Sequence, residues 1–207
     1  MSRCKSVVLL LMLCMVTVAH ADVINGCVVR SGAQCVEKNL REIQLKDADL
    51  ARSDFSRADL SYSILTGANF RNANLDTTNF HGADLRNANF TEADMTRAIL
   101  EDAKLDGAIF KNARLDIAEL RGAQLNVTQM SGANLSNATL VRTNLQGAQL
   151  QKADLTGADL SYADLRNADL SGAKLDNAKL INANLRGAIT ISATVNKANT
   201  SGCTGCP

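Results

Sequence analysis

Two stretches decide the fold: SGANLSNATL at residues 131–140, and QKADLTGADLSYADLRNADL at residues 151–170. Every group of five ends in a large apolar residue, and a small residue stands two positions before it. Outward from these stretches the pattern runs without insertion from residue 36 to residue 185, as thirty units. A fixed short period indicates a repeat architecture, in which each unit stacks on its neighbours.

The residue types within a unit predict how the chain turns. The large residue, at position i, is always Leu, Phe or Met, and position i−2 is nearly always Ala. A period of five suits neither an α-helix nor a lone strand, but i and i−2 share one face of an extended segment. Each unit is therefore expected to be a short extended piece followed by a corner, where Gly or Asn supplies positive φ. Repeated corners would wind the chain into coils about 4.8 Å apart.

The repeat resembles the pentapeptide-repeat family, whose consensus is A(D/N)LXX. That resemblance implies an all-β solenoid, a right-handed quadrilateral parallel β-helix of about 7–8 coils and roughly 36 Å in length. Four units per coil would stack residues twenty positions apart. Phe70, Phe90 and Phe110 would then form an aromatic ladder in an interior filled by side chains, so no cofactor is expected.

The N-terminus differs from the repeat. Arg3 and Lys5 precede an apolar run from Val7 to Val18, and Ala19-His20-Ala21 follows, as in a secretory signal peptide. The sequence thus predicts a signal peptide at 1–21, an N-terminal cap at 22–35, the β-helix at 36–188 and a C-terminal cap or tail at 189–207. The mature chain would be exported, periplasmic or secreted, with no membrane association after cleavage.

Charge and composition narrow the classes of function. Without Arg3 and Lys5, 20 basic residues remain against 21 acidic ones, a net charge of about −1. A nearly neutral chain is not expected to bind nucleic acid, nor does it resemble a strongly acidic DNA mimic.

Four cysteines remain after signal cleavage, and an even number in an exported protein favours disulfides. In the rod that the resemblance implies, Cys27 and Cys35 lie at one end and Cys203 and Cys206 at the other, so each pair would close its own end. The CxxC sequence at 203–206 also leaves open thiol chemistry, metal binding, a disordered tail or intermolecular pairing.

Catalytic groups are sparse, so no enzyme activity, catalytic residue, metal or cofactor is predicted. The mature chain has one histidine, His81, at an i+1 surface position, beside Ser61 and Glu101 in its column. Consecutive aspartates at i−1 would point in four directions, which suits corner hydrogen bonds and not an acid–base pair: Asp154, Asp159, Asp164 and Asp169.

One column of i+1 positions contains only hydroxyl and acidic side chains, and we call it the polar stripe. It could bind a cation, a basic partner or a polar polymer, or it could simply suit a tight corner. Its members are Ser56, Asp76, Thr96, Asp116, Ser136, Thr156 and Asp176.

The sequence therefore predicts a non-catalytic exported module that binds a protein or surface partner, or has a structural role; the partner is unknown. The alternatives are a DNA-mimicking topoisomerase-binding protein, which export and neutral charge disfavour, and a thiol-redox protein acting through Cys203 and Cys206. Exposed coil ends would also allow an end-to-end homodimer.

Overall fold

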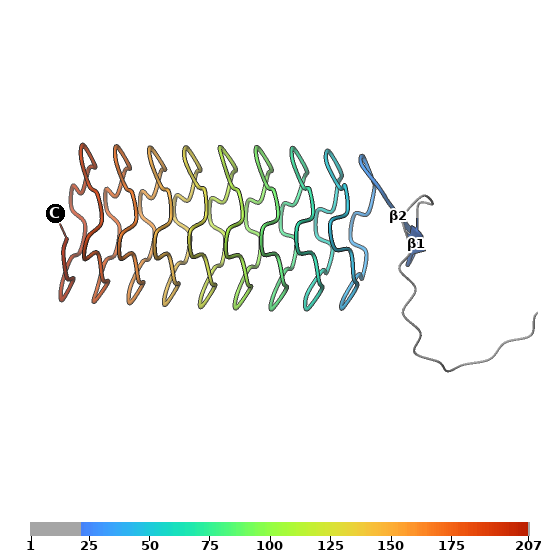
Figure 1. Ribbon diagram of the computed structural model, residues 1–207, viewed down its shortest axis with the longest axis horizontal. Coiled ribbons are helices and arrows are strands. Elements are labelled where there is room, and N and C mark those ends of the chain that lie inside the picture. Colours follow the sequence, from blue (N-terminus) through green and yellow to red (C-terminus); the bar gives the residue numbers. More distant parts are fainter. Residues whose placement is uncertain (1–21, 207) are drawn as a thin grey trace, which may run out of the picture.

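The computed structural model describes residues 22–206, which form a straight stack of four-sided coils (Figure 1). Parallel bridges pair each i−1 residue with the residue twenty positions later, from Gln34 with Asp54 to Asn184 with Thr204. This register is that of a right-handed quadrilateral β-helix with four units per coil, which confirms the fold predicted from the five-residue period. Because each bridge is one residue long, the coils contain no longer strands.

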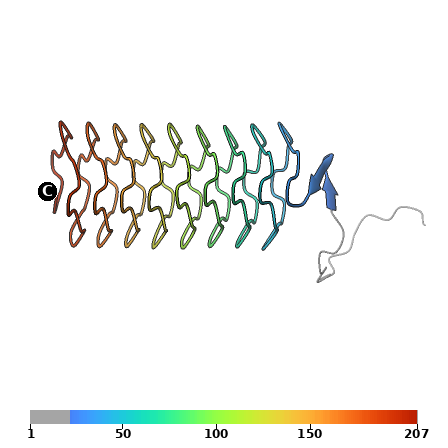
Figure 2. The same ribbon diagram turned by 90° about the horizontal axis from the view of Figure 1, so that it is seen from above.

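The two named strands lie outside the coils, at the N-terminal end of the rod (Figure 2). Strand β1 (Asp22–Ile24) pairs with β2 (Cys27–Val29) in an antiparallel hairpin. Its turn, Asn25-Gly26, has positive φ at both residues, 50° and 75°, as type I′ turns require. The side chains of Cys27 and Val29 are buried, so the hairpin covers part of the first coil.

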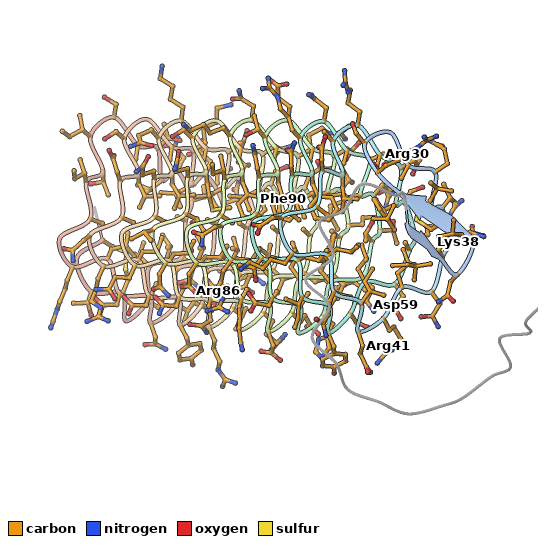
Figure 3. The ribbon with its side chains drawn as sticks, turned by 45° about the vertical axis from the view of Figure 1, so that its right-hand side comes forward. Arg30, Lys38, Arg41, Asp59, Arg86 and Phe90 are labelled. Carbon is orange, nitrogen blue, oxygen red and sulfur yellow. A yellow bond between two sulfur atoms is a disulfide. The ribbon has the colours of Figure 1, made fainter. Side chains whose placement is uncertain are left out.

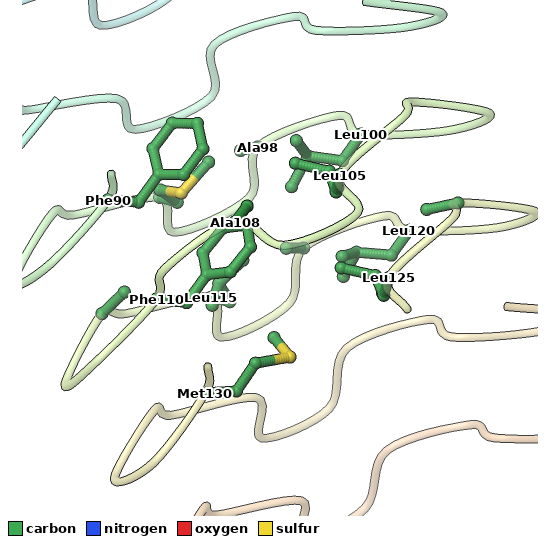
Figure 4. Close-up of a cluster of buried hydrophobic side chains, with 14 of the residues drawn as sticks. Phe90, Ala98, Leu100, Leu105, Ala108, Phe110, Leu115, Leu120, Leu125 and Met130 are labelled. Atoms are coloured by element: carbon green, nitrogen blue, oxygen red, sulfur yellow. The ribbon is translucent and has the colours of Figure 1, made fainter. Parts of the chain in front are cut away.

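The core is a set of columns that run along the rod axis. The i residues from Leu40 to Leu185 are buried, as are most of the small i−2 residues. Phe90, Phe110 and Met130 follow one another down one column, and Leu100 and Leu120 down another (Figure 4). Phe70 stacks on Phe90 with ring centroids 5.2 Å apart, so the predicted aromatic ladder is confirmed.

Every corner has the same backbone geometry. The amide of residue i+3 donates to the carbonyl of residue i, as from Ala58 to Phe55 at 2.9 Å, and the residue at i+2 has positive φ throughout the coils. Positive φ at the third residue is typical of type II turns. Gly and Asn occupy many of these positions, as predicted, but Ile117 (φ 61°) and Val127 (φ 50°) do so as well.

The coil winding continues beyond the predicted repeat boundary at residue 188. The segment expected to form a cap or tail pairs with the preceding coil as far as Thr204, so 189–204 is one more coil. Its inward residues are only partly buried, in contrast to Leu40 and Cys35 at the other end. The C-terminal end of the rod is therefore open, whereas the hairpin partly covers the N-terminal end.

The predicted signal peptide, 1–21, lies outside the described residues. Within 22–206, no helix has the length and apolar character needed to cross a membrane.

Candidate functional site

The aspartates and asparagines at i−1 cap the corners that follow them. The side-chain oxygen of each accepts a hydrogen bond from the backbone amide two residues later, as from Thr156 to Asp154 (3.0 Å) and from Ser171 to Asp169 (2.9 Å). Asx side chains stabilise turns in this way. The prediction that Asp154, Asp159, Asp164 and Asp169 make corner hydrogen bonds is confirmed.

These caps lower the pKa of the carboxylates. Partial burial raises the pKa of Asp159, but hydrogen bonds from Ser161 and the nearby Lys179 ammonium outweigh burial and bring the pKa below its ordinary value. The guanidinium of Arg166 donates to Asp164 and lowers the pKa of that carboxyl group. A carboxylate that is stabilised as an anion is suited to accept hydrogen bonds in a structural cap. It is poorly suited to general acid–base catalysis, in which it must gain a proton.

The residues of the polar stripe form hydrogen bonds and ion pairs mainly with residues of their own column and of the neighbouring columns. The hydroxyl of Thr96 donates to Asp94 (2.7 Å) and to Asp116 (3.2 Å), and Arg97 pairs with Asp76 at 2.8 Å. Asp176 accepts from the hydroxyl of Thr194 and from the amide of Asn196. These contacts account for hydroxyl and acidic residues at this corner, and binding of a partner by the stripe stays a prediction.

No group of three or more His, Cys, Asp or Glu residues within 22–206 is arranged to hold a metal ion. The stripe carboxylates Asp76 and Asp116 lie two coils apart with Thr96 between them. Their side chains pair with arginines instead, Arg97 at 2.8 Å and Arg114 at 3.7 Å.

A second cluster surrounds Tyr62, which shares a column with Tyr162; by sequence alone the two residues, five coils apart, are too distant to form one site. The ring of Tyr62 lies beneath the guanidinium of Arg41 (5.4 Å to the centroid) and meets the ring of His81 edge-on at 5.3 Å. The ring packs against Gly82, where any Cβ would clash with it. The neighbouring Ser61 hydroxyl is buried and has no hydrogen-bond partner among the described residues. Figure 3 shows Arg41 and Asp59, which pair at 3.3 Å, on one outer edge of the rod.

A tyrosine with an arginine over its ring recurs five coils further along, with Ile181 and Asn182 in place of His81 and Gly82. ADLSY at 58–62 is repeated at 158–162, and Arg142 lies over the ring of Tyr162 at 5.9 Å. Both tyrosines have positive φ, near 60°, and both are about half exposed. A bulky residue in this conformation is unusual. The repeated ADLSY sequence could have identified this tyrosine edge, defined by Arg41, Tyr62, His81, Arg142 and Tyr162.

Both pairs of cysteines are disulfide-bonded, in the pairing expected for the rod. Cys27 and Cys35 are fully buried, with Cα atoms 5.1 Å apart. Cys203 and Cys206, 5.9 Å apart, lie partly exposed in the last coil. Between them Gly205 has φ 76°, and a Cβ there would lie 2.9 Å from the backbone of Leu185 and Arg186. This CxxC therefore closes a tight turn at the end of a coil.

Comparison with known proteins places this β-helix among proteins built from pentapeptides. The sequence pattern of the family described as pentapeptide repeats matches eight copies, in residues 39–76, 73–112, 118–157 and 153–189. The chain belongs to this pentapeptide-repeat family. A comparison with curated proteins gives no match.

Two solved structures show how far the similarity reaches. HetL from the cyanobacterium Nostoc sp. strain PCC 7120, involved in heterocyst differentiation regulation, is 32% identical over 82% of this chain and 89% of its own, with a TM-score of 0.52. QnrB1, a plasmid-mediated fluoroquinolone resistance protein, is 20% identical over 80% of this chain and 90% of its own, with a TM-score of 0.65. QnrB1 supports the fold alone. Both proteins are described by regulation or resistance and not by a catalysed reaction.

Proposed function

We propose that this chain is an exported, non-catalytic binding module, and that its tyrosine edge recognises a partner protein. One observation carries the proposal: Tyr62 and Tyr162 sit on the same edge in the same sequence context, each with an arginine over its ring. Tyr and Arg dominate the energetic centres of protein interfaces. The rings are already held in place, so binding would cost little conformational entropy.

The tyrosine edge leaves room for the ring of Tyr62. Like every i+2 residue of the coils, both tyrosines have positive φ. The neighbouring coil has Gly82, which carries no Cβ, where the ring of Tyr62 lies. Because the interior columns are filled by buried side chains, recognition is left to the outer surface.

The test is affinity capture from periplasm or culture medium with the full mature chain. Replacing Tyr62 and Tyr162 by Ala should abolish enrichment of a specific partner. The matched control replaces Ile117 and Val127 by Ala, since these are also exposed residues at positive φ but lie on other edges. Equal capture by the tyrosine variant and the native chain would refute the proposal. Export is tested separately, by an intact mass beginning at Asp22 in the exported fraction.

A homodimer through the C-terminal ends is a second proposal, carried by the open last coil. The amides of Leu170, Leu175 and Leu180 donate to the next coil, but those of Thr190, Val195 and Thr200 have no backbone acceptor among the described residues. Ile191 is 72% exposed. Because the hairpin partly covers the other end, two open ends would meet symmetrically and form a closed dimer, not a filament.

Light scattering across a range of protein concentrations tests this dimer. Val195→Glu would bring like charges together at the symmetric contact and should give monomers, whereas Ile117→Glu in the middle of the rod should not. A native chain that stays monomeric at every concentration would exclude the dimer and leave the tyrosine-edge proposal untouched.

The alternatives receive less support. Similarity to QnrB1 at 20% identity concerns the fold, so it does not favour topoisomerase binding. The Cys203–Cys206 disulfide closes a coil end, and a redox role for it stays a prediction.

A further inference from the structure

The edge diagonally opposite the tyrosine edge carries a hollow between two arginines. Ala51, Arg52, Arg71 and Asn72 line an open depression of about 360 Å³. Ala51 leaves the depression open because its side chain is a single methyl group at a position where the next coil has Arg71. Arg52 and Arg71 both line the hollow, and the carboxamide of Asn72 adds a donor and an acceptor. Paired guanidinium groups are suited to binding carboxylates.

The cations along this edge have fewer close carboxylate partners than those on the other three edges. On those edges arginines pair closely with acids, as Arg57 with Glu37 (2.8 Å) and Arg86 with Asp84 (2.6 Å). Here Arg71 approaches Glu92 only to 3.9 Å. Within residues 22–206, the other three cations of the edge form no ion pair. We call the set the basic edge: Arg52, Arg71, Lys111 and Lys152.

The basic edge follows a straight line. Arg52 and Lys152 are five coils apart, about 24 Å at the parallel-strand spacing. Hydroxyl and amide side chains alternate with the cations at this corner: Asn72, Thr91, Asn112, Ser131, Gln151 and Ser171. Arg30, which projects from the N-terminal end of the rod (Figure 3), precedes the same corner and extends the line.

The adjoining side of the rod is rich in amides and poor in charge. Its i−1 column reads Asp49, Asn69, Asn89, Ile109, Gln129, Gln149, Asp169 and Ile189. The side chains of Gln129 and Gln149 make no hydrogen bond to the described residues, and Asn89 uses only its oxygen, which accepts from Thr91. We call Asn69, Asn89, Gln129 and Gln149 the amide face. It offers hydrogen bonds to hydroxyl groups next to a line of cations.

We propose that the basic edge and the amide face together bind an extended acidic polysaccharide of the uronic-acid class. Carboxylates of the polymer contact Arg52, Arg71, Lys111 and Lys152, with one carboxylate held in the Arg52–Arg71 hollow. Its hydroxyl groups bond to the free amides of Gln129, Gln149 and Asn89. This proposal rests on the proposed export, and it gives the rod a second role, because the opposite edge stays free for a protein.

The composition of this surface favours a polysaccharide over other anionic polymers. It has no aromatic side chain on which a nucleic-acid base could stack, since both tyrosines lie on the diagonal edge. Interfacial membrane binding needs a broad apolar face with aromatic or leucine side chains, whereas these columns are mostly amide and hydroxyl. This surface presents amide groups beside cationic groups. The amides can bond to the hydroxyl groups of an acidic sugar, and the cations can bind its carboxylates.

The proposal is tested by calorimetry at low salt, which measures binding of short oligogalacturonate to the full mature chain. Replacing Arg52, Arg71, Lys111 and Lys152 by Gln should weaken binding by about tenfold or more, because charge-assisted contacts are lost. The matched control replaces Lys46, Lys104, Arg186 and Lys197 by Gln. These four cations also form no ion pair within the described residues, and they lie away from the basic edge: Lys46, Arg186 and Lys197 are on other edges, and Lys104 is on a side of the rod. The net charge changes equally, and binding should persist.

A second variant separates sugar recognition from simple charge attraction. Replacing Gln129 and Gln149 by Ala leaves the charge unchanged, and it should weaken oligogalacturonate but not inorganic polyphosphate. Equal losses in the basic-edge and control variants would overturn the proposal, as would binding only to phosphatidylglycerol vesicles or polyphosphate. Failure of this test with partner capture intact would leave the tyrosine edge standing, since Tyr62 and Tyr162 are unchanged in every variant.

Discussion

The rings of Phe90 and Phe110 are stacked in successive coils, with centroids 4.9 Å apart and planes 11° from parallel. This spacing is set by the backbone, because the two residues are twenty positions apart and the coils repeat at the distance of paired strands. Phe80 meets Phe90 edge-on at 6.2 Å from the column on the opposite side of the core. The five phenylalanines therefore form one connected cluster in the N-terminal half of the rod.

Phe90→Ala should destabilise the rod by about 3–5 kcal/mol, because it removes a fully buried ring and leaves a cavity between Phe70 and Phe110. Urea unfolding followed by circular dichroism measures the loss. Phe90→Leu is the matched control: Leu fills most other i positions, so its loss should be clearly smaller. Equal losses would mean that the volume restored by Leu contributes little and that the ring contacts themselves carry the stability.

Val127→Asn should stabilise the chain by about 1 kcal/mol, since Val is β-branched and disfavoured at positive φ whereas Asn tolerates it. Val127 is 60% exposed, so little burial is lost. The control is Val141→Asn, at an i+1 corner position without positive φ, which should leave the melting temperature nearly unchanged. A lower melting temperature for Val127→Asn would show that its side chain makes stabilising contacts with the neighbouring coils.

Much of this architecture could be predicted from sequence because it depends on period and size. Leu or Phe at i and Ala at i−2 determine which side chains point inward, and the period determines that Phe70, Phe90 and Phe110 share a column. The acidic residue of ADL also indicated its role, since an Asx side-chain oxygen before a corner readily accepts a hydrogen bond from the backbone amide two residues later. Both disulfides followed from the distance between the rod ends.

Other features depended on side-chain directions that a period does not encode. Arg86 and Arg52 occupy comparable corners, yet the first pairs with Asp84 and the second borders an open hollow. The difference arises from which carboxylate lies within reach. The hairpin at 22–29 had a readable signal in Asn25-Gly26 between apolar residues, which is typical of type I′ turns. Thr190 and Thr200 are not large and apolar, but Ala193 and Ala198 keep the small i−2 position and indicate that the winding continues, which the bridges up to Thr204 confirm.

The stability of the rod should fall in acid. Hydrogen bonds lower the pKa values of Asp159, Asp164 and Asp169 from 3.8, and the nearby Lys179 and Arg166 add to the effect at Asp159 and Asp164. A lowered pKa in the folded state means that the stabilisation is fully present well above pH 3.8, and is lost as the pH falls below that value and through the folded pKa. Thermal melts should therefore be insensitive to these groups from about pH 5 to 8 and drop below about pH 4. Replacing the three aspartates by Asn should flatten that drop, and an unchanged acid slope would assign it to other groups.

Reduction of the C-terminal disulfide should loosen the last coil alone. Cys203 and Cys206 are partly exposed, whereas Cys27 and Cys35 are fully buried. Mild dithiol treatment should therefore reduce the C-terminal disulfide before the N-terminal one. The coil from residue 189 to residue 204 has a neighbour on one side only, and its opening should cost least. Hydrogen exchange should therefore accelerate at Thr194, Asn199 and Thr204, whose amides bond to the preceding coil, and stay slow at Phe90. A Cys203→Ser, Cys206→Ser double variant should show the same local change without reductant. Uniform acceleration along the rod would mean that this disulfide holds the whole β-helix together and not only its end.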